Sequence, residues 1–598
     1  MCGIWGGNRN YDLDIVQSKL DFMKFRGPDH TGIFESRPVQ LGSNRLSIVD
    51  QSHVSNMPFQ KHQHVLVFNG EIYNFRELRK KHLNHVAFIT DSDTEVLLEL
   101  YLKYGPECLN MLNGMFAFVI YDIENQHFFG ARDRLGIKPL YYYHANGAFE
   151  FSSQPKPIVI GNVPSVDLNA QLQYFIWTHI PDPFCIYKGV SKLSPGCYFQ
   201  FNNNSGTLKI QHYWDVKNIE IIPNRKWKLD EWKEQLEELI EDAIKIRIPE
   251  SVNFGVALSG GIDSSLITAI AASNISDLRT YTVSFEDSIY NEGVYAKHIS
   301  NLLNTNHTDI LCTARESLEV IKNLPLHFDE PFSDSSAIPS TLLFETVSKD
   351  CSVILTGDGA DESFFGYPRY WKTLNTSNSF LREGFKWSLA NLFGLSNISK
   401  QKFNHIGQYY LDLMISSNIQ SIIEPNVLIA ARSCVAENYI VKKESMVSDM
   451  MGFDLRYYLN NDINTKMDRS AMFHSVETRS PFMDYRLVNF AKSIPFEFLY
   501  DGTSGKKILK DLLFDKLPVD LFDRPKKGFS VPIKNWFRNE MKDYVLDLVT
   551  KNNLNRIPII DTDKMLKLRD RHLDGKIDDS KIIFSIISYI NWLNFNKL

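Results

Sequence analysis

A glycine-rich loop near the middle of the chain has the residue types and spacing of a phosphate-binding site. Residues 254–265 read FGVALSGGIDSS, an apolar run typical of a buried strand followed by Ser-Gly-Gly and the first turn of a helix. Such a turn directs several free backbone N–H groups, and the positive end of the helix dipole, at one point. No lysine closes the loop as in GxxxxGKS nucleotidases, and Asp263 would repel a phosphate unless Mg²⁺ lay between them. A bare Ser-Gly-Gly would more often be an ordinary solvated turn, so the rest of the string carries the prediction.

Cys2 is the second residue with predicted chemistry, because it directly follows the initiator methionine. Removal of Met1 would leave Cys2 with a free α-amine, which titrates near pH 8 and can act as the local base for its own thiol. One residue would then supply both nucleophile and base. A cysteine at position 2 taken alone is most simply chance, so this prediction depends on the motifs that follow it.

Composition limits the kinds of protein that the chain can be. At 598 residues it is too long for one domain, and 43% hydrophobic and 13% aromatic residues provide full-sized cores. The net charge of −6, without a long basic run, gives no support for a nucleic-acid or anionic-membrane partner. Seven scattered cysteines form neither a disulfide framework nor a zinc motif.

The two ends of the chain bear on its location. The N-terminal stretch lacks the apolar core of a signal peptide. The apolar run 582–595 is interrupted by serine and asparagine, and we predict a docked helix because the run is too short and polar to cross a bilayer. We therefore expect a protein of the reducing cytoplasm.

The two motifs lie in regions with different patterns. Residues 1–213 are β-rich, with short aromatic and β-branched runs at 64–74, 114–122 and 127–143 and one clear helix at 93–104. Residues 214–230 carry little pattern and are a candidate linker. From residue 231 strands alternate with helices, which predicts a parallel sheet wrapped by helices, with ligands at the carboxyl ends of the strands. The expected strands are 252–258, 280–285, 307–312 and 351–356, and the expected helices 264–273, 293–303, 314–323 and 337–349. Residues 370–450 are predicted to be helical but carry no interpretable motif.

An ordered set of motifs in the N-terminal region resembles the class II glutamine amidotransferase domain along its full length. The set is CGIWG after Met1, RGPD (26–29), RLSIVD (45–50), NGEIYN (69–74), SDTE (92–95), GMFAF (114–118) and RDRLGIKPLYY (132–142). The resemblance implies an αββα N-terminal-nucleophile fold over 2–213, in which Cys2 attacks the side-chain amide of glutamine. It also implies that Arg45 holds the α-carboxylate, Asp93 balances the ammonium, Glu71 helps to bind the amino-acid end, and Asn69 and the Gly70 N–H hold the oxyanion.

Together with this domain, the central and C-terminal motifs resemble the glutamine-hydrolysing asparagine synthetase family. The central loop is similar to the pyrophosphate loop of ATP pyrophosphatases. It is accompanied by EPFSDSSAIPS (330–340), LTGDGADE (355–362), NTKMDRSAM (464–472), SVETRSPFMD (475–484) and RPKKGFSVPI (524–533). The implied second domain is a doubly wound parallel-sheet ATP pyrophosphatase over 231–598, after a linker at 214–230. The implied substrates are glutamine, aspartate and ATP with Mg²⁺, and a homodimer is one oligomeric state that the resemblance allows.

The resemblance also implies the residues of the second site. Asp263 and Asp361 would hold Mg²⁺, Lys526 or its neighbour Lys527 would neutralise the departing pyrophosphate, and Asp358 would handle the ammonia proton unless it serves as a turn residue. Pyrophosphate would bind to Ser259, Gly260, Gly261, Asp263, Ser264 and Ser265, and adenosine to Leu258, Val283, Thr356 and Gly357, mainly through backbone groups.

Departures from the family pattern leave the acceptor open. Residues 363–365, Thr478 and Ser480 differ from the usual types and are expected near the acceptor pocket, where Arg479 would pair with a substrate carboxylate or with Glu477. Two alternatives to asparagine synthesis therefore stand. One is the same chemistry on another carboxylate, such as a sugar uronic acid or a natural-product precursor. The other, a catalytically silent glutamine- or nucleotide-binding regulator, is disfavoured because both sets of site residues are retained.

Overall fold

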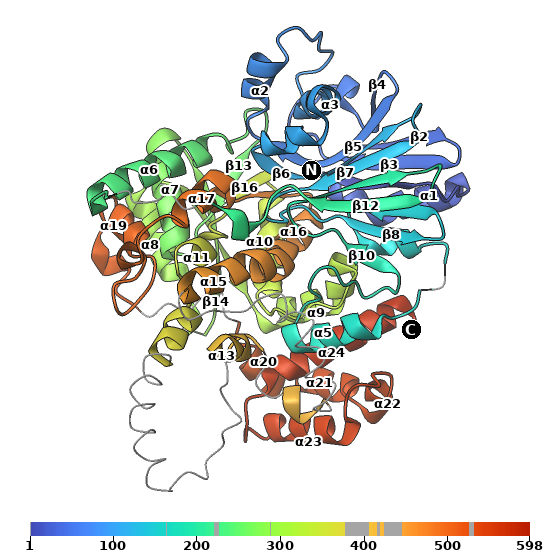
Figure 1. Ribbon diagram of the computed structural model, residues 1–598. Helices are drawn as coiled ribbons and strands as arrows, with labels where there is room; N and C mark the ends of the chain where they lie inside the picture. The colour runs from blue at the N-terminus through green and yellow to red at the C-terminus, as the bar shows by residue number, and fades with distance from the viewer. Residues whose placement is uncertain are drawn as a thin grey trace, which may run out of the picture.

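The computed structural model describes residues 2–162, 164–220, 226–287, 289–376, 406–415, 419–423, 445–524 and 531–598. Within these residues three sheets organise the chain (Figure 1). Two six-stranded antiparallel sheets use the N-terminal third, and a five-stranded parallel sheet with its helices uses much of the remainder. The predicted α/β class, with an αββα N-terminal part and a parallel sheet after it, is confirmed.

The first antiparallel sheet contains the predicted nucleophile. Its order is β10-β8-β9-β1-β3-β2, and the register of β1 (Cys2–Gly7) on β3 (Val39–Arg45) places Cys2 opposite Arg45. Helix α1 (Leu13–Phe22) packs on β1 and β3 through its buried apolar face. The other strands are β2 (His30–Ser36), β8 (Tyr141–Ala145), β9 (Ala148–Ser152) and β10 (Val190–Lys192).

The second antiparallel sheet lies between the first sheet and two helices. Successive side chains of a strand point to opposite faces, and on β7 (His127–Arg132) Phe128 contacts Phe149 of the first sheet whereas Phe129 stacks on Tyr101 of α3 (Asp93–Tyr104). The order is β12-β11-β7-β6-β5-β4. The other elements are β4 (Phe59–Lys61), β5 (His64–Ile72), β6 (Gly114–Asp122), β11 (Cys197–Asn202), β12 (Thr207–His212) and α2 (Phe75–His82), which packs on α3.

The run 127–143 divides between the two sheets. Strand β7 ends at Arg132, and β8 begins at Tyr141 in the other sheet. Between them the Asp133 carboxylate accepts hydrogen bonds from the backbone N–H groups of residues 135, 137 and 138. This loop carries the chain from one sheet to the other.

The parallel sheet has the order β15-β14-β13-β16-β17. The four predicted strands are present as β13 (Phe254–Ala257), β14 (Arg279–Phe285), β15 (Asn306–Cys312) and β16 (Val353–Leu355), and sequence analysis missed β17 (Glu477–Arg479). The predicted helices are α7 (Ile262–Asn274), α8 (Gly293–Leu302), α9 (Ala314–Phe328) and α10 (Ala337–Val347). The chain runs outward from β13 in one direction and returns to β16 on its other side. The switch point therefore lies between the carboxyl ends of β13 and β16, where open α/β sheets bind ligands.

The C-terminal helix α24 (Ser580–Asn596) is docked, as predicted, and it joins the two parts of the chain. It packs on α9 and on α5 (Leu168–Trp177), which lies between β9 and β10 in sequence (Figure 1). Gln171 Nε2 donates to Tyr589 Oη at 2.7 Å, and Tyr174 Oη donates to the carbonyl of Ser585 at 2.8 Å. Among the described residues, no helix has the length and apolar character needed to cross a membrane.

Further helices cover the parallel sheet and build the C-terminal part. Of the region 370–450, the described part includes α13 (Ile406–Asp412), whereas 377–405, 416–418 and 424–444 lie outside the described residues. The other helices are α4 (Pro155–Val159), α6 (Leu229–Lys245), α11 (Ala360–Ser363), α15 (Met446–Phe453), the π-helical η6 (Asp454–Asn464), α16 (Thr465–Met472), α17 (Tyr485–Ala491), α18 (Phe496–Leu499), α19 (Lys507–Phe514), α20 (Ile533–Arg538), α21 (Lys542–Leu548), α22 (Lys551–Leu554) and α23 (Thr562–Leu573).

Candidate active sites

The first candidate site surrounds Cys2 at the start of β1. Cys2 is buried, burial raises the pKa of its thiol, and its backbone N–H donates to Asn69 Oδ1 at 3.1 Å. Within the described part of the chain, the buried Nδ2 of Asn69 has no hydrogen-bond partner. Buried amide donors are almost always paired, so an unused donor beside a nucleophile points to a ligand, as an oxyanion hole requires.

Only glycine fits at position 70, because the backbone of β6 passes very close to it. A Cβ atom at Gly70 would lie 2.1 Å from the carbonyl oxygen of Met115, and the φ of Gly70 is +156°. No side chain fits there. The backbone of residues 69–71 can therefore run directly against β6, next to Cys2.

The Arg45 guanidinium organises the loop that follows β3. Its two terminal nitrogens donate to the carbonyls of Ser52 at 3.1 Å and Val49 at 3.2 Å, to Asn56 Oδ1 at 2.8 Å, and to the carbonyl of Asp50. These bonds use four N–H groups. A glutamine α-carboxylate at Arg45, as predicted, would have to share donors with this loop.

Asp93 and Glu71 are both buried, and burial raises the pKa of each carboxyl. Asp93 begins α3, and its Oδ2 accepts the N–H of Ile72 at 2.9 Å, which places it beside Glu71. Glu71 Oε2 lies 3.2 Å from Nη2 of Arg479 on β17, and Arg479 Nε donates to Glu477 Oε1 at 2.6 Å. Of the two partners expected for Arg479, the structure shows the internal ion pair.

The second candidate site is the loop between β13 and α7. Ser259 N–H donates to Ser264 Oγ at 3.2 Å, Gly260 takes a left-handed φ of +75°, and Gly261 is the N-cap of α7. Leu258 and Val283 are buried in the sheet, as expected if only their backbone faces a ligand. Ser265 also lies in the first turn of α7, and its buried Oγ has no hydrogen-bond partner in the described structure.

Asp263 and Asp361 converge on one cation, Lys506, which sequence analysis missed. Lys506 Nζ is 2.5 Å from Asp263 Oδ2 and 2.7 Å from Asp361 Oδ1. The two carboxylates raise the pKa of Lys506 against the opposing effect of burial, so the side chain is a cation. Because Lys506 is 243 residues from Asp263 and belongs to none of the motifs, no local sequence signal marks it.

The positions of Phe364 and Phe365 explain how Lys506 is placed. Both side chains are fully buried, Phe364 against Phe482 and Phe365 against Tyr370. They belong to the core behind α11, and their expected place near the acceptor pocket stays a prediction. The carbonyl of Phe364 accepts the N–H of Lys506 at 3.1 Å, which fixes the start of α19 at the loop.

Asp358 follows β16 at the switch point. Burial raises the pKa of its carboxyl, and within the described residues its Oδ2 has no hydrogen-bond partner. Its carbonyl accepts a hydrogen bond from Ser480 Oγ at 2.5 Å, which gives this unusual serine a structural role. Thr356 N–H donates to the carbonyl of Arg479 at 3.0 Å, and a Cβ at Gly357 would lie 3.0 Å from Asp263 Cβ.

Lys526 and Lys527 lie outside the described residues, as does the whole of 525–530. The residue before this segment, Arg524, donates from Nη2 to the carbonyl of Gly260 at 2.8 Å. Arg524 is a further cation at the pyrophosphate loop that the sequence analysis did not name.

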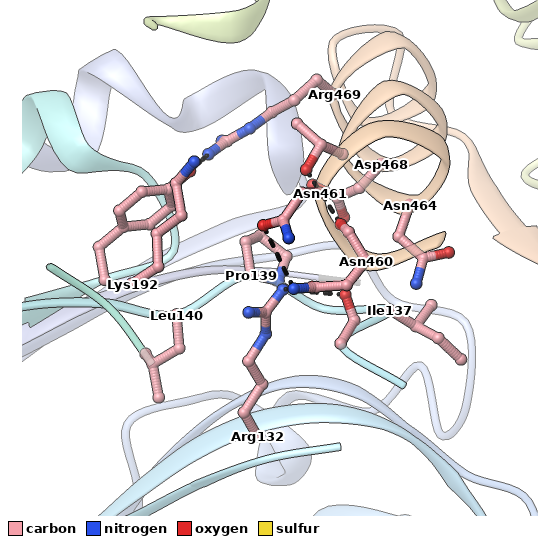
Figure 2. Close-up of a pocket in the computed structure, with 13 residues that line it drawn as sticks. Arg132, Ile137, Pro139, Leu140, Lys192, Asn460, Asn461, Asn464, Asp468 and Arg469 are labelled. Atoms are coloured by element: carbon pink, nitrogen blue, oxygen red, sulfur yellow. Dashed lines mark hydrogen bonds between the residues drawn. The ribbon is translucent and has the colours of Figure 1, made fainter. Parts of the chain in front are cut away.

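A small polar cavity lies where the N-terminal sheets meet η6 and α16 (Figure 2). Arg132 Nη2 donates to Asn460 Oδ1 at 3.0 Å there, and Ile137, Leu140 and Lys192 also line the cavity. Next to it, Arg26 forms a buried two-bond pair with Asp468 at 2.8 and 3.0 Å. Arg26 Nε also donates to the carbonyl of Cys2 at 3.2 Å, so the nucleophile's strand is tied to α16.

Comparison with known families gives the class of protein: a glutamine amidotransferase domain joined to an asparagine synthase domain. The family model for the glutamine amidotransferase domain matches residues 1–214, and the model for asparagine synthase matches residues 235–594. The chain belongs to the asparagine synthase family. It is an enzyme of the glutamine-hydrolysing ligase type, and the family resemblance found in the sequence is confirmed.

Curated relatives cover both regions. Asparagine synthetase [glutamine-hydrolyzing] 1 of Bacillus subtilis is 29% identical over 100% of this chain and 97% of its own. Putative asparagine synthetase [glutamine-hydrolyzing] 2 of Methanocaldococcus jannaschii is 34% identical over 61% of this chain and 76% of its own. Amidase chyE of Penicillium rubens is 24% identical over 92% of this chain and 89% of its own.

Proposed function

We propose that this enzyme makes asparagine from aspartate, using ATP and the amide nitrogen of glutamine. The observation that carries the proposal is the convergence of Asp263 and Asp361 on one point at the pyrophosphate loop, in a chain that also presents Cys2 beside an unused amide donor. A carboxylate is a poor electrophile, and adenylation by ATP converts it into a mixed anhydride that ammonia can attack.

At the first site, Cys2 Sγ attacks the side-chain carbonyl of glutamine. The nitrogen that becomes the free α-amine after removal of Met1 already bonds to Asn69 Oδ1, so it is oriented beside the thiol whose proton it accepts. Asn69 Nδ2 and the Gly70 N–H stabilise the oxyanion. Ammonia leaves, and water then hydrolyses the glutamyl thioester to glutamate. Arg45, Glu71 and Asp93 hold the amino-acid end.

At the second site, the backbone and side chains of residues 259–265 hold the departing pyrophosphate, and Leu258, Val283, Thr356 and Gly357 surround adenosine. Asp263 and Asp361 would hold Mg²⁺, because two hard carboxylates completed by substrate phosphates are ligands that this ion takes, and the ion would then displace the Lys506 ammonium that lies between them here. When bound there, Mg²⁺ would neutralise charge on the phosphate oxygens. Lys506, with Lys526 or Lys527, adds positive charge as pyrophosphate leaves, and Asp358 accepts the proton of the attacking ammonia.

We assign the glutaminase to residues 2–213, the linker to 214–230 and the synthetase to 231–598, in the cytoplasm. The ranges matched by the two family models, and the change from antiparallel to parallel sheets, support this division. Strand β17 and helix α24 each make a buried contact with the N-terminal region.

A panel of carboxylates tests the acceptor. In the presence of ATP and Mg²⁺, addition of L-aspartate should cause release of pyrophosphate from ATP. When glutamine is also present, the product should be asparagine. Cys2→Ala should abolish the glutamine-dependent reaction and leave the ammonia-dependent reaction running, because the thiol is needed only to release ammonia from glutamine. The similarity to an amidase favours a second candidate, the same chemistry on a larger carboxylate. Pyrophosphate release with a uronic acid or a peptide-like carboxylate, and none with aspartate, would replace the asparagine assignment by that candidate.

A further inference from the structure

Strand β17 lies between the two candidate sites, and its last residue, Arg479, contacts both. On the glutaminase side, Arg479 Nη2 is 3.2 Å from Glu71 Oε2, and Glu71 directly follows Asn69 and Gly70 on β5. On the synthetase side, the Arg479 carbonyl accepts the N–H of Thr356 at 3.0 Å. The next residue, Ser480, donates its hydroxyl to the carbonyl of Asp358 at 2.5 Å.

Arg479 is held firmly except at one nitrogen. Its Nε bonds to Glu477 at 2.6 Å, its Nη1 donates to the carbonyl of Arg247 at 2.9 Å, and the residue is 2% exposed. Nη2 is within ion-pair distance of Glu71, but no hydrogen bond of good geometry involves it within the described residues. A buried donor without a hydrogen bond loses the free energy of its contact with water and gains no full bond in return. A small displacement of either partner would therefore change the free energy of this contact substantially.

A second buried ion pair between the two parts, Arg26 with Asp468, differs from this contact. Both terminal nitrogens of Arg26 bond to Asp468, and its Nε bonds to the carbonyl of Cys2. Each nitrogen of the Arg26 guanidinium therefore has a hydrogen-bond partner. The Glu71–Arg479 contact is the link whose geometry can respond to a ligand.

We propose that Arg479 is a positioning residue that couples occupancy of the glutamine site to the geometry of the acceptor site. The inference rests on the proposed function, since it takes Glu71 as part of the glutamine site and Thr356 and Asp358 as part of the acceptor site. A substrate ammonium beside Glu71 and Asp93 shares the Glu71 carboxylate with Arg479, so the ion pair differs between the empty and the filled site. Because Arg479 and Ser480 bond directly to the 356–358 turn, displacement of Arg479 moves that turn.

The test replaces Arg479 by Gln and by Lys and measures how much glutamate forms per amidated product. Loss of the link should raise this ratio at least about fivefold, the lower end of typical coupling between sites. Basal glutamine hydrolysis without ATP, and ammonia-dependent amidation, should both remain near wild type. Arg247→Lys is the matched control, because Arg247 is a buried arginine at the same boundary whose side chain pairs with Asp484 instead of Glu71.

A second measurement uses equilibrium binding in a Cys2→Ala background, where glutamine binds without being consumed. Glutamine should tighten binding of the acceptor together with a non-hydrolysable ATP analogue, and the acceptor should tighten glutamine binding by the same factor. Arg479→Gln should remove both effects. If the variant keeps the wild-type ratio and the wild-type linkage, or loses both basal activities in proportion to a fall in Tm, the positioning role is wrong. Failure of the proposed function would show separately, as absence of pyrophosphate release with aspartate in the wild type. The ratio of glutamate to amidated product would then be measured with the carboxylate that is active.

Discussion

At the scale of single residues, the amide of Asn69 is the group that most constrains the glutaminase chemistry. One end orients the Cys2 nitrogen, and the other is a buried donor that no described residue uses. Such a donor costs free energy in the empty enzyme and recovers it when negative charge develops nearby. A preorganised oxyanion site has this property, whereas a purely structural asparagine would have both ends paired.

Asn69→Ala should therefore lower kcat for glutamine hydrolysis by about 10²–10³-fold, the usual effect of removing one oxyanion donor. The KM for glutamine should change little, because the donor acts mainly in the transition state, and ammonia-dependent amidation should be retained. Ser43→Ala is the control, since the hydroxyl of Ser43 on β3, in the first sheet, is another buried group without a hydrogen-bond partner among the described residues. Wild-type kcat in Asn69→Ala would contradict the assignment.

The sequence predicted the residues of both sites where a motif carries them and missed those that only the fold brings together. Asn69, Gly70, Asp263 and Asp361 lie in continuous motifs. The structure brings Asn69 to the Cys2 N–H and Asp263 and Asp361 to one lysine, and the roles of these residues stay predictions. Lys506 has no signal, because an ion pair between residues 243 positions apart leaves no periodicity or spacing to detect.

At the scale of elements, alternation of strands and helices predicted the four strands that follow helical crossovers, but β17 escaped detection. It has three residues, and it pairs with a strand more than 120 positions earlier in the chain. Its burial is set by neighbours that sequence periodicity does not report. Sequence periodicity also does not report the burial of Asp329, which ends α9 in a left-handed conformation with its carboxyl fully buried.

Asp329 predicts a pH dependence of stability. Burial raises the pKa of Asp329 to about 7, against about 4 in an unfolded chain. The contribution of Asp329 to the free energy of unfolding is fully present below pH ~4. Between pH ~4 and ~7 this carboxyl ionises only in the unfolded state, so the free energy of unfolding falls as pH rises, by ~1.4 kcal/mol per pH unit. Asp329→Asn removes the titrating group. Its Tm relative to wild type should therefore rise between about pH 4 and about pH 7.

The control for this titration is Asp561→Asn. The N–H of Lys564 lowers the pKa of the exposed Asp561, so that carboxylate stabilises the fold above pH ~4 and loses its effect in acid. The Asp561 variant should be less stable than wild type near neutral pH and equal to it in acid. A Tm difference for Asp329→Asn that stays constant from acid to neutral pH would show that folding does not raise the pKa of Asp329.

At the scale of the whole molecule, the two sites meet across a buried boundary built from both parts of the chain. Arg26 with Asp468, Glu71 with Arg479, and α5 with α24 all join the N-terminal region to the parallel-sheet region. The family resemblance predicted two sites and their order along the chain. It did not predict this boundary, because the contacts depend on how two independently patterned regions pack.

The most direct test of the account uses aspartate labelled with ¹⁸O in its side-chain carboxylate, glutamine labelled with ¹⁵N in its amide, and Mg·ATP. Adenylation bonds a carboxylate oxygen to the α-phosphorus, and attack by ammonia leaves that oxygen on AMP. Mass spectrometry should therefore find ¹⁵N in the amide of asparagine and one ¹⁸O in AMP, with unlabelled pyrophosphate. AMP without ¹⁸O, or asparagine without ¹⁵N, would contradict transfer of glutamine nitrogen to an adenylated aspartate.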